Sequence, residues 1–289
     1  MKRKLHLLLI DPQNDFCDLP PAYRPIDPVS GERCAPALPV AGAHADMLRV
    51  ADLIRRGASG LSDITVTLDS HHRIDIAHPT FWTGADGEPV APFTQILAQD
   101  VRAGRYLPRQ SAALPRVLAY LDALESAQRY RLMVWPVHCE IGSWGQNVHR
   151  DVRAAYNGWE EATLGTVAKI GKGDNPWTEH YSAIMAEVPD PQDEDTQLNR
   201  RLIARLAQAD LLYIAGEAGS HCVRATTEHI ADNLGQDQLS RLVLLTDCMS
   251  PVAGFEAQQA DFIRGMAARG ARLAVAADVL PELLANARR

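Results

Sequence analysis

The chain has 289 residues, of which 46% are hydrophobic and 22% charged, and it carries a net charge of −7. These proportions are typical of a soluble globular protein with room for a large core. The acidic balance and the lack of a Lys/Arg block argue against nucleic acid as a partner. The apolar run over residues 5–10 is interrupted by His6 and is too short for a signal core or a membrane span, so we expect no membrane partner.

Short apolar runs alternate with segments of helical periodicity through most of the chain. Runs that are apolar on both faces and are joined by helices are typical of a parallel sheet covered on both sides. We therefore predict a single α/β domain over 1–289, a three-layer α/β/α sandwich with a central, mainly parallel sheet. The predicted strands are 5–10, 64–68, 131–135, 166–170, 211–215, 242–246 and an edge strand at 272–275. The predicted helices are 43–56, 114–126, the region 147–156, 196–208, 222–233, 256–268 and 281–287.

Two stretches fit this alternation poorly. The proline-rich segment 18–38 has little periodicity and predicts an ordered surface loop, and the region from about 84 to 109 lacks a clear strand. We interpret both as parts of loop insertions, near 18–40 and 84–115, with a further one near 184–197. Long loops in compact domains are often binding lids, although decoration of the surface is an equal alternative here.

Five cysteines are scattered along the chain with no CxxC pair. This odd number and wide spacing favour reduced thiols over a disulfide framework, and therefore a cytoplasmic protein. Cys17, Cys34, Cys139 and Cys248 are interpreted as structural. Cys222 differs because it follows a buried strand and a run of small residues and begins an amphipathic segment.

A thiol at a helix N-terminus lies beside the positive end of the helix dipole, which favours the thiolate. Backbone N–H groups of that first turn lack helical partners and can hold an oxyanion. Cys222 is therefore a candidate nucleophile, with a small buried hydrophobe as the alternative. Asp11 and Lys172 follow two other predicted strands and are a candidate base and a candidate cation that lowers the thiol pKa. Taken singly, each has an ordinary explanation, as a turn cap and as an exposed lysine.

A second group of polar residues lies at the same predicted edge of the sheet. Asp69 and His71 follow the second predicted strand, and His138 follows the third. Mixed carboxylate and imidazole ligands suit Zn²⁺ or Fe²⁺ better than Ca²⁺ or Mg²⁺. His78, His72 or water could supply a fourth ligand.

Together these segments resemble the nicotinamidase branch of the isochorismatase-like cysteine hydrolases, in the family's linear order from about residue 7 to 275. The resemblance is carried by Ile-Asp-Pro-Gln-Asn-Asp-Phe at 10–16, Leu-Asp-Ser-His at 68–71 with His-Pro-Thr-Phe at 78–81, Trp-Pro-Val-His-Cys at 135–139, Lys-Gly at 172–173 with His-Tyr-Ser-Ala at 180–183, Gly-Glu-Ala-Gly-Ser-His-Cys-Val at 216–223 and Leu-Thr-Asp-Cys at 245–248.

The resemblance implies a catalytic triad of Asp11, Lys172 and Cys222. It implies an oxyanion hole made by the backbone amides of Ala218 and Cys222, with a cis peptide bond before Ala218. The substrate ring would be flanked by Phe16, Trp135 and Tyr181, and the metal ligands would be Asp69, His71 and His138, with His78 less certain. The metal, one divalent Zn²⁺ or Fe²⁺ with Mn²⁺ as a further candidate, would hold a pyridine nitrogen and orient the substrate.

The predicted activity is hydrolysis of nicotinamide to nicotinate and ammonia through a Cys222 thioester, in NAD salvage. An alternative keeps the triad but acts on another small amide, such as a carbamoyl or ureido compound. Isochorismate ether cleavage is a weaker alternative because it needs no nucleophilic cysteine. A non-catalytic binding protein on the same fold is the alternative outside enzymes. We also expect a homo-oligomer.

Overall fold

The computed structural model describes residues 2–289 and contains a six-stranded sheet in the order β10-β9-β8-β1-β2-β7. All five neighbouring pairs in this sheet are parallel. The strands are β1 Leu5–Ile10, β2 Asp63–Asp69, β7 Ala168–Lys172, β8 Leu211–Gly216, β9 Leu242–Leu245 and β10 Arg272–Ala274. Every residue of β1 is buried, as expected for a central strand covered on both faces.

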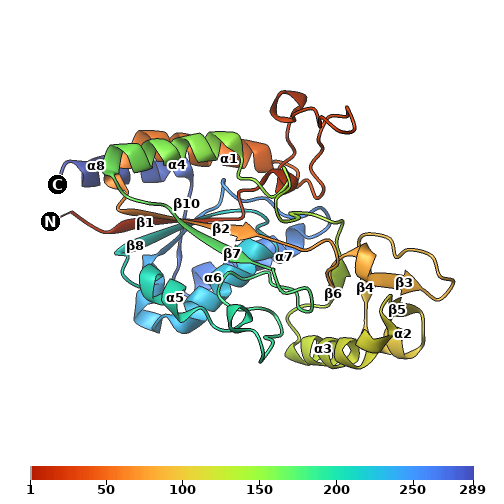
Figure 1. The fold of residues 1–289 in the computed structure, drawn as a ribbon. Coiled ribbons are helices and arrows are strands. Elements are labelled where there is room, and N and C mark those ends of the chain that lie inside the picture. Colours follow the sequence, from red (N-terminus) through yellow and green to blue (C-terminus); the bar gives the residue numbers. More distant parts are fainter. Residues whose placement is uncertain (1) are drawn as a thin grey trace.

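Helices cover both faces of this sheet (Figure 1). One face carries α1 Ala43–Gly57, α4 Arg150–Thr163 and α8 Ala276–Ala287, and the other carries α5 Arg200–Leu206, α6 Cys222–Asn233 and α7 Glu256–Ala268. The predicted three-layer α/β/α fold is confirmed. The last helix begins at Ala276 rather than at Pro281, so that proline lies inside the helix.

The predicted strand 131–135 is real but does not belong to the main sheet. It is β6 Leu132–Val134, which pairs antiparallel with β4 Thr94–Ile96. Nearby, β3 Trp82–Gly84 pairs antiparallel with β5 Tyr106–Pro108. The prediction that 84–109 lacks strands was therefore wrong. Short apolar runs indicate a strand without indicating its partner, and three-residue strands leave almost no periodic pattern.

Two further helices, α2 Ala98–Arg102 and α3 Leu114–Ala127, pack beside these short strands at one side of the molecule (Figure 1). The segment 18–40 also projects from the main sheet and contains one short turn of helix at Pro21–Tyr23. It is ordered by backbone hydrogen bonds, of which Leu38 N–H to Asp15 C=O at 3.1 Å anchors its end beside the sheet.

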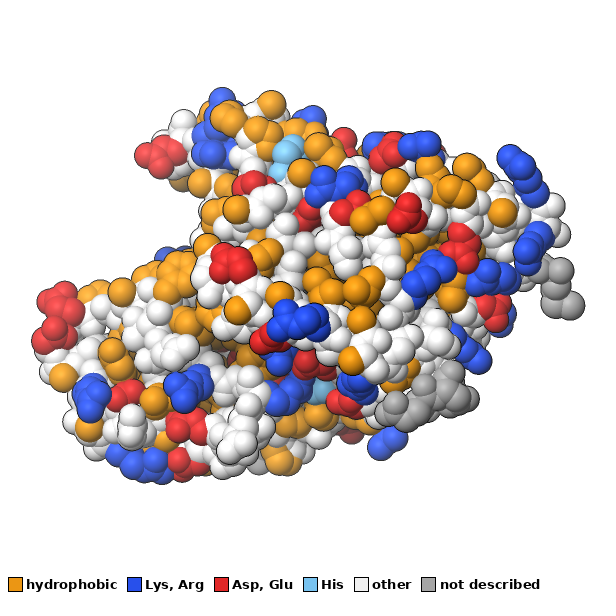
Figure 2. Space-filling view, turned by 180° about the vertical axis from the view of Figure 1, so that it is seen from behind, with side chains coloured by type: hydrophobic (Ala, Val, Ile, Leu, Met, Phe, Trp, Pro, Cys, Tyr) orange, Lys and Arg blue, Asp and Glu red, His pale blue; other side chains and the backbone are white. Residues whose placement is uncertain are grey.

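Figure 2 shows the surface hollowed between these two projecting parts, with acidic and basic side chains intermixed over the visible face. Within residues 2–289, no helix has the length and apolar character needed to cross a membrane. The five cysteines are all free, and four of them are buried.

Candidate active site

Four neighbouring strands of the parallel sheet bring four predicted site residues to one edge. Asp11 follows β1, Asp69 ends β2, Lys172 ends β7, and Cys222 begins α6 after β8. The strand order β8-β1-β2-β7 places these strands side by side, and Asp69 and Lys172 are paired in register. Parallel strands end at the same edge, which is where open α/β sheets bind ligands.

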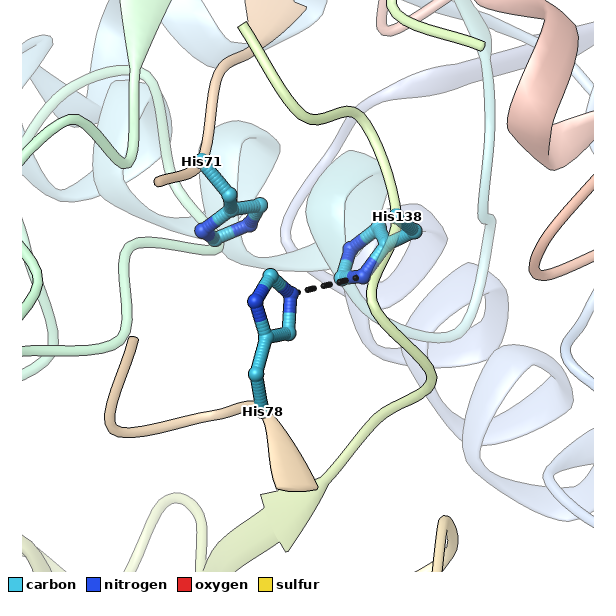
Figure 3. A group of neighbouring side chains, drawn as sticks. All are labelled: His71, His78 and His138. Atoms are coloured by element: carbon cyan, nitrogen blue, oxygen red, sulfur yellow. Dashed lines mark hydrogen bonds between the residues drawn. The ribbon is translucent and has the colours of Figure 1, made fainter. Parts of the chain in front are cut away.

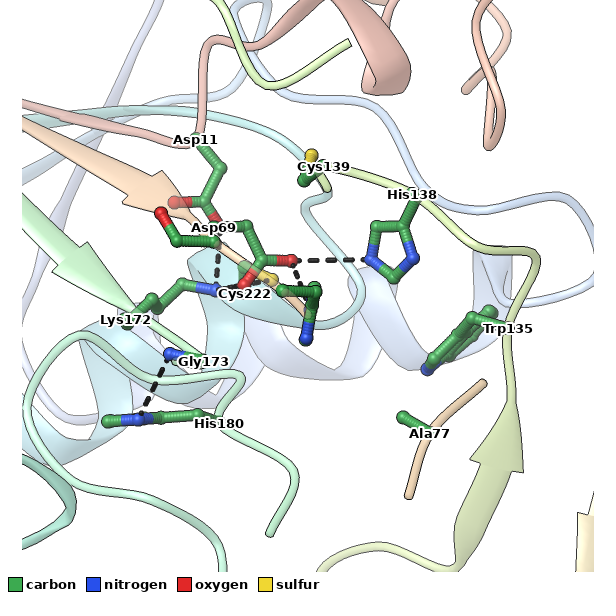
Figure 4. A network of polar contacts seen from close by, with 12 residues as sticks. Asp11, Asp69, Ala77, Trp135, His138, Cys139, Lys172, Gly173, His180 and Cys222 are labelled. Carbon is green, nitrogen blue, oxygen red and sulfur yellow. Dashed lines mark hydrogen bonds and ion pairs between the residues drawn. The ribbon is translucent and has the colours of Figure 1, made fainter. Parts of the chain in front are cut away.

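Lys172 is the centre of this group (Figure 4). Its Nζ lies 2.9 Å from Asp11 Oδ2, 2.8 Å from Asp69 Oδ1 and 3.6 Å from Cys222 Sγ. The lysine is 3% exposed, so the alternative of an exposed loop lysine was wrong. Burial alone would lower the pKa of Lys172, but Asp11 and Asp69 raise it well above its usual value, so the ammonium form persists.

Asp11 is held from two directions. The Thr67 hydroxyl donates to Asp11 Oδ1 at 2.5 Å, and Lys172 contacts the other carboxyl oxygen. The residue has a φ of 45°, an uncommon conformation for a residue other than glycine. Burial raises the pKa of Asp11 and Lys172 opposes this, so the carboxylate is a stronger base than an exposed aspartate.

Cys222 lies at the first turn of α6, as predicted from the small residues before it. The Glu217–Ala218 peptide bond is cis. Among the residues that the structure describes, the N–H groups of Ala218 and Cys222 donate to no other protein group. Both N–H groups are therefore free to bind an oxyanion.

The charge state of the thiol differs from the sequence-based expectation. Burial raises the pKa of Cys222 well above its usual value; Lys172 opposes this, while Asp11 and Asp69 raise it further. Burial of the thiol and, after it, the sharing of one ammonium by two buried carboxylates favour the neutral thiol. No single strand end reveals this balance.

The predicted metal ligands converge next to this group (Figure 3). His71, His78 and His138 each direct one ring nitrogen to a common point, with these atoms within 4.8 Å of one another. Asp69 Oδ2 lies 3.1 Å from His71 Nε2 and 3.3 Å from His138 Nε2. His138 reaches the cluster from the segment after β6, not from a neighbouring strand of the main sheet as predicted.

This donor set fits a transition-metal cation. Imidazole and carboxylate ligands suit Zn²⁺ and Fe²⁺, and the Nδ1 of His71 lies 3.0 Å from Asp75 Oδ2, which orients the ring. Burial lowers the pKa of His78 to about 3, with His138 and His71 contributing, so His78 stays neutral as a ligand must. His72, considered as a fourth ligand, is instead exposed and paired with Asp174.

A small cavity of about 20 Å³ is lined by both Cys222 and His138, and so joins the nucleophile to the imidazole cluster. Trp135 Nε1–H donates to the Tyr181 hydroxyl at 3.1 Å, and their rings meet edge to face. The three residues predicted to flank a ring, Phe16, Trp135 and Tyr181, all line this cavity. The cavity is lined by Phe16, Leu38, Asp69, Trp135, His138, Glu179, Tyr181, Ala218, His221, Cys222 and Val252.

Sequence reasoning missed several cavity residues. Leu38 comes from the 18–40 segment, which therefore shapes the cavity and is not only surface decoration. Val252 and Glu179 lie in loops whose composition is unremarkable. Glu179 is only two residues before Tyr181, but no residue type or spacing in this stretch distinguishes an inward carboxylate from a solvated one.

Comparison with protein-family models and with curated proteins found no match to this chain. Solved structures do match. A nicotinamidase/pyrazinamidase from Acinetobacter baumanii matches with a TM-score of 0.58 and 18% identity, over 96% of this chain and 98% of that one. A yeast nicotinamidase bound to the inhibitor nicotinaldehyde matches with a TM-score of 0.60 and 17% identity, over 94% and 99%.

A pyrazinamidase from Pyrococcus horikoshii in complex with zinc matches with a TM-score of 0.50 and 18% identity, over 94% of this chain and 99% of that one. At such low identity these similarities establish the fold and leave the activity to be argued from the site. The predicted resemblance is thereby confirmed at the level of fold: the chain has the α/β fold found in solved nicotinamidases and pyrazinamidases.

Proposed function

We propose that the protein is a cysteine amidohydrolase that converts a small heteroaromatic carboxamide, with nicotinamide as the parent compound, to its carboxylate and ammonia. The observation that carries the proposal is the position of Lys172 Nζ, within 2.9 Å of Asp11 Oδ2 and 3.6 Å of Cys222 Sγ at one cavity. A nucleophile, a base and a fixed cation in contact are the components that acyl transfer through a thioester requires.

The first half-reaction forms the thioester. Asp11 takes the Cys222 proton as sulfur attacks the amide carbon, and the N–H groups of Ala218 and Cys222 stabilise the oxyanion. The C–N bond then breaks, and Asp11 returns the proton to the leaving nitrogen, which departs as ammonia. Lys172 keeps its charge throughout and stabilises the Asp11 carboxylate and the developing thiolate.

The second half-reaction regenerates the thiol. Asp11 takes a proton from water, the resulting hydroxide adds to the thioester carbon, and the carbon–sulfur bond breaks. The thiolate recovers the proton from Asp11, so one water is consumed for each carboxylic acid and ammonia formed. The acid then gives up its proton, to ammonia or to water, and leaves as the carboxylate. Asp69, His71, His78 and His138 would hold a divalent metal, which supplies a Lewis-acid contact to a ring nitrogen when bound.

The test measures ammonia release from a panel of nicotinamide, pyrazine carboxamide, benzamide and a ureido compound. We expect release from the two nitrogen heterocycles, little from benzamide, and none with Cys222→Ala. Turnover of the ureido compound alone would favour the other-amide alternative. No release from any amide by metal-loaded protein would contradict the proposal and favour a binding protein. NAD salvage, a cytoplasmic location and a homo-oligomer stay predictions from the sequence.

A further inference from the structure

One carboxyl group in the cavity has no role in the proposed chemistry. Glu179 is 4% exposed and lines the cavity together with Cys222 and Tyr181. Its Oε1 accepts a hydrogen bond from the His180 backbone N–H at 3.0 Å. Its Oε2 has no hydrogen-bond partner within the described part of the chain.

The backbone fixes Glu179 in this position. Its N–H donates to the Tyr120 hydroxyl at 3.2 Å, and its carbonyl accepts from the Glu187 N–H at 3.0 Å. These bonds hold the backbone, and a side chain that turned to solvent would lose the His180 contact. The contact thus favours the position in which Oε2 stays buried beside the cavity.

Glu179 shares the cavity with the imidazole cluster, because Asp69 and His138 line it as well. The carboxamide of a substrate must reach Cys222 and the Ala218 amide. A substrate that fills this cavity with its carboxamide at Cys222 therefore also meets Glu179.

A buried oxygen without a partner is costly, and such groups in native proteins call for an explanation. A ligand that donates a hydrogen bond to Oε2 would remove the cost. A ligand with only a C–H or a methyl group at that point would exclude water from the oxygen and so increase this free-energy cost. Sites built to bind a polar group reject analogues that lack it more strongly than apolar pockets reject a missing methyl.

We propose that Glu179 is a specificity-determining residue that accepts a hydrogen bond from an amino or hydroxyl group on the substrate ring. The preferred substrate is then a ring-substituted heteroaromatic carboxamide, and unsubstituted nicotinamide is a poorer one. This inference rests on the proposed function, which it narrows to a substrate class.

The experiment compares matched pairs of nicotinamides that carry an amino or a methyl group at ring carbon 5 or 6. The two groups have similar size, but only the amino group donates. We expect wild-type kcat/KM for one amino compound to exceed that of its methyl partner about tenfold or more, because the methyl group would leave the Glu179 oxygen without a hydrogen bond.

Glu179→Gln is the diagnostic variant because it keeps the shape of the side chain. The His180 N–H requires the amide oxygen, so the NH₂ group would face the cavity and oppose an amino substituent. We expect the amino preference, measured as the ratio of kcat/KM between the amino compound and its methyl partner, to disappear. Glu161→Gln, at an exposed position on α4, is the matched control and should retain the preference.

Binding gives a readout that does not depend on turnover. Calorimetry with Cys222→Ala and with Cys222→Ala/Glu179→Gln should show the same amino preference and its loss. The assignment of Glu179 would be overturned if the wild type showed no difference between the amino and the methyl compound in either pair. It would also be overturned if the amino preference persisted in Glu179→Gln. Failure of the proposed function looks different: no ammonia would form from any amide, while the binding comparison would still report on Glu179.

Discussion

Asp75 Oδ2 lies 3.0 Å from His71 Nδ1 and leaves the other nitrogen of that ring to face Asp69 and the imidazole cluster. This contact fixes both the orientation of the ring and its basicity. Burial alone would lower the pKa of His71, but Asp69 and Asp75 raise it well above its usual value. The site thus favours a positive charge at His71, which a bound metal would supply in place of the proton.

Asp75→Asn should therefore weaken metal binding. Removing the carboxylate behind a metal-ligating histidine typically lowers metal affinity by about 10- to 100-fold. The measurement is competition with a chromophoric chelator, with Asp52→Asn, at a half-exposed position on α1, as control. Equal affinities of Asp75→Asn and wild type would show that Asp75 does not tune a metal ligand.

Thr67→Val should impair catalysis more than its small change suggests. The variant removes the hydroxyl that donates to Asp11 Oδ1 and leaves that buried oxygen without this bond. We expect kcat to fall about tenfold as the base loses its orientation, and the free energy of unfolding to fall by about 1.5–3 kcal/mol, as for a bond to a charged group.

Thr65→Val on the same strand is the matched control. Thr65 is equally buried, but its hydroxyl lies 2.9 Å from His6 Nε2, away from the site. This variant should lose about 1 kcal/mol of stability and keep kcat within about twofold. A similar kcat for both variants would contradict a positioning role for Thr67.

His6 should make the protein less stable in acid. Burial lowers the pKa of His6 to about 4, so the unfolded chain takes up its proton near pH 6.5 while the folded chain does not. The contribution of neutral His6 to the free energy of unfolding is intact above pH 6.5. It is lost as the pH falls from 6.5 toward 4, at about 1.4 kcal/mol per pH unit.

His6→Gln removes this titration but keeps a polar side chain beside Thr65. Between pH 7.5 and pH 5, the variant should lose about 2 kcal/mol less stability than the wild type, measured by urea unfolding. Parallel stability curves for the two proteins would show that His6 titrates normally in the folded state. The two proteins are compared by the slope of unfolding free energy against pH, so a stability cost of the substitution that is the same at every pH does not affect the result.

Gly216→Ala should disrupt the junction between β8 and the nucleophile turn. Gly216 has a φ of 125°, and a Cβ there would lie 1.9 Å from the Ile10 carbonyl oxygen on β1. Alanine disfavours this backbone conformation, and its Cβ would clash with backbone atoms of β1, which cannot move aside easily. We therefore expect the free energy of unfolding to fall by more than about 3 kcal/mol.

Gly104→Ala separates the two causes. Gly104 also has positive φ, at 71°, but a Cβ there meets nothing within 4 Å. In this control the free energy of unfolding should fall by only about 1–2 kcal/mol, the cost of placing a residue with a Cβ in the left-handed conformation. Thermal unfolding of both variants measures the difference, and equal losses would show that the contact with Ile10 is unimportant.

Much of the fold could be predicted because its signals are local. The run 5–10 is apolar on both faces, and the small residues before Cys222 indicate a strand, a turn and a helix. Asp11 and Lys172 were expected to lie close together for the same reason, since strand ends in a parallel sheet converge. The 131–135 run was assigned to the wrong sheet because β pairing is a long-range choice that an apolar pattern does not encode.

The sequence by itself determined which residue types follow each buried strand, and therefore which chemistry is available at the edge of the sheet. Only the tertiary structure decided how the charges balance there, because Lys172 is shared between Asp11 and Asp69 and burial raises the pKa of Cys222. Only the tertiary structure placed Glu179 in the cavity. Burial and charge pairing depend on distances between residues far apart in the chain, and it is these distances that turn a set of reactive side chains into a site.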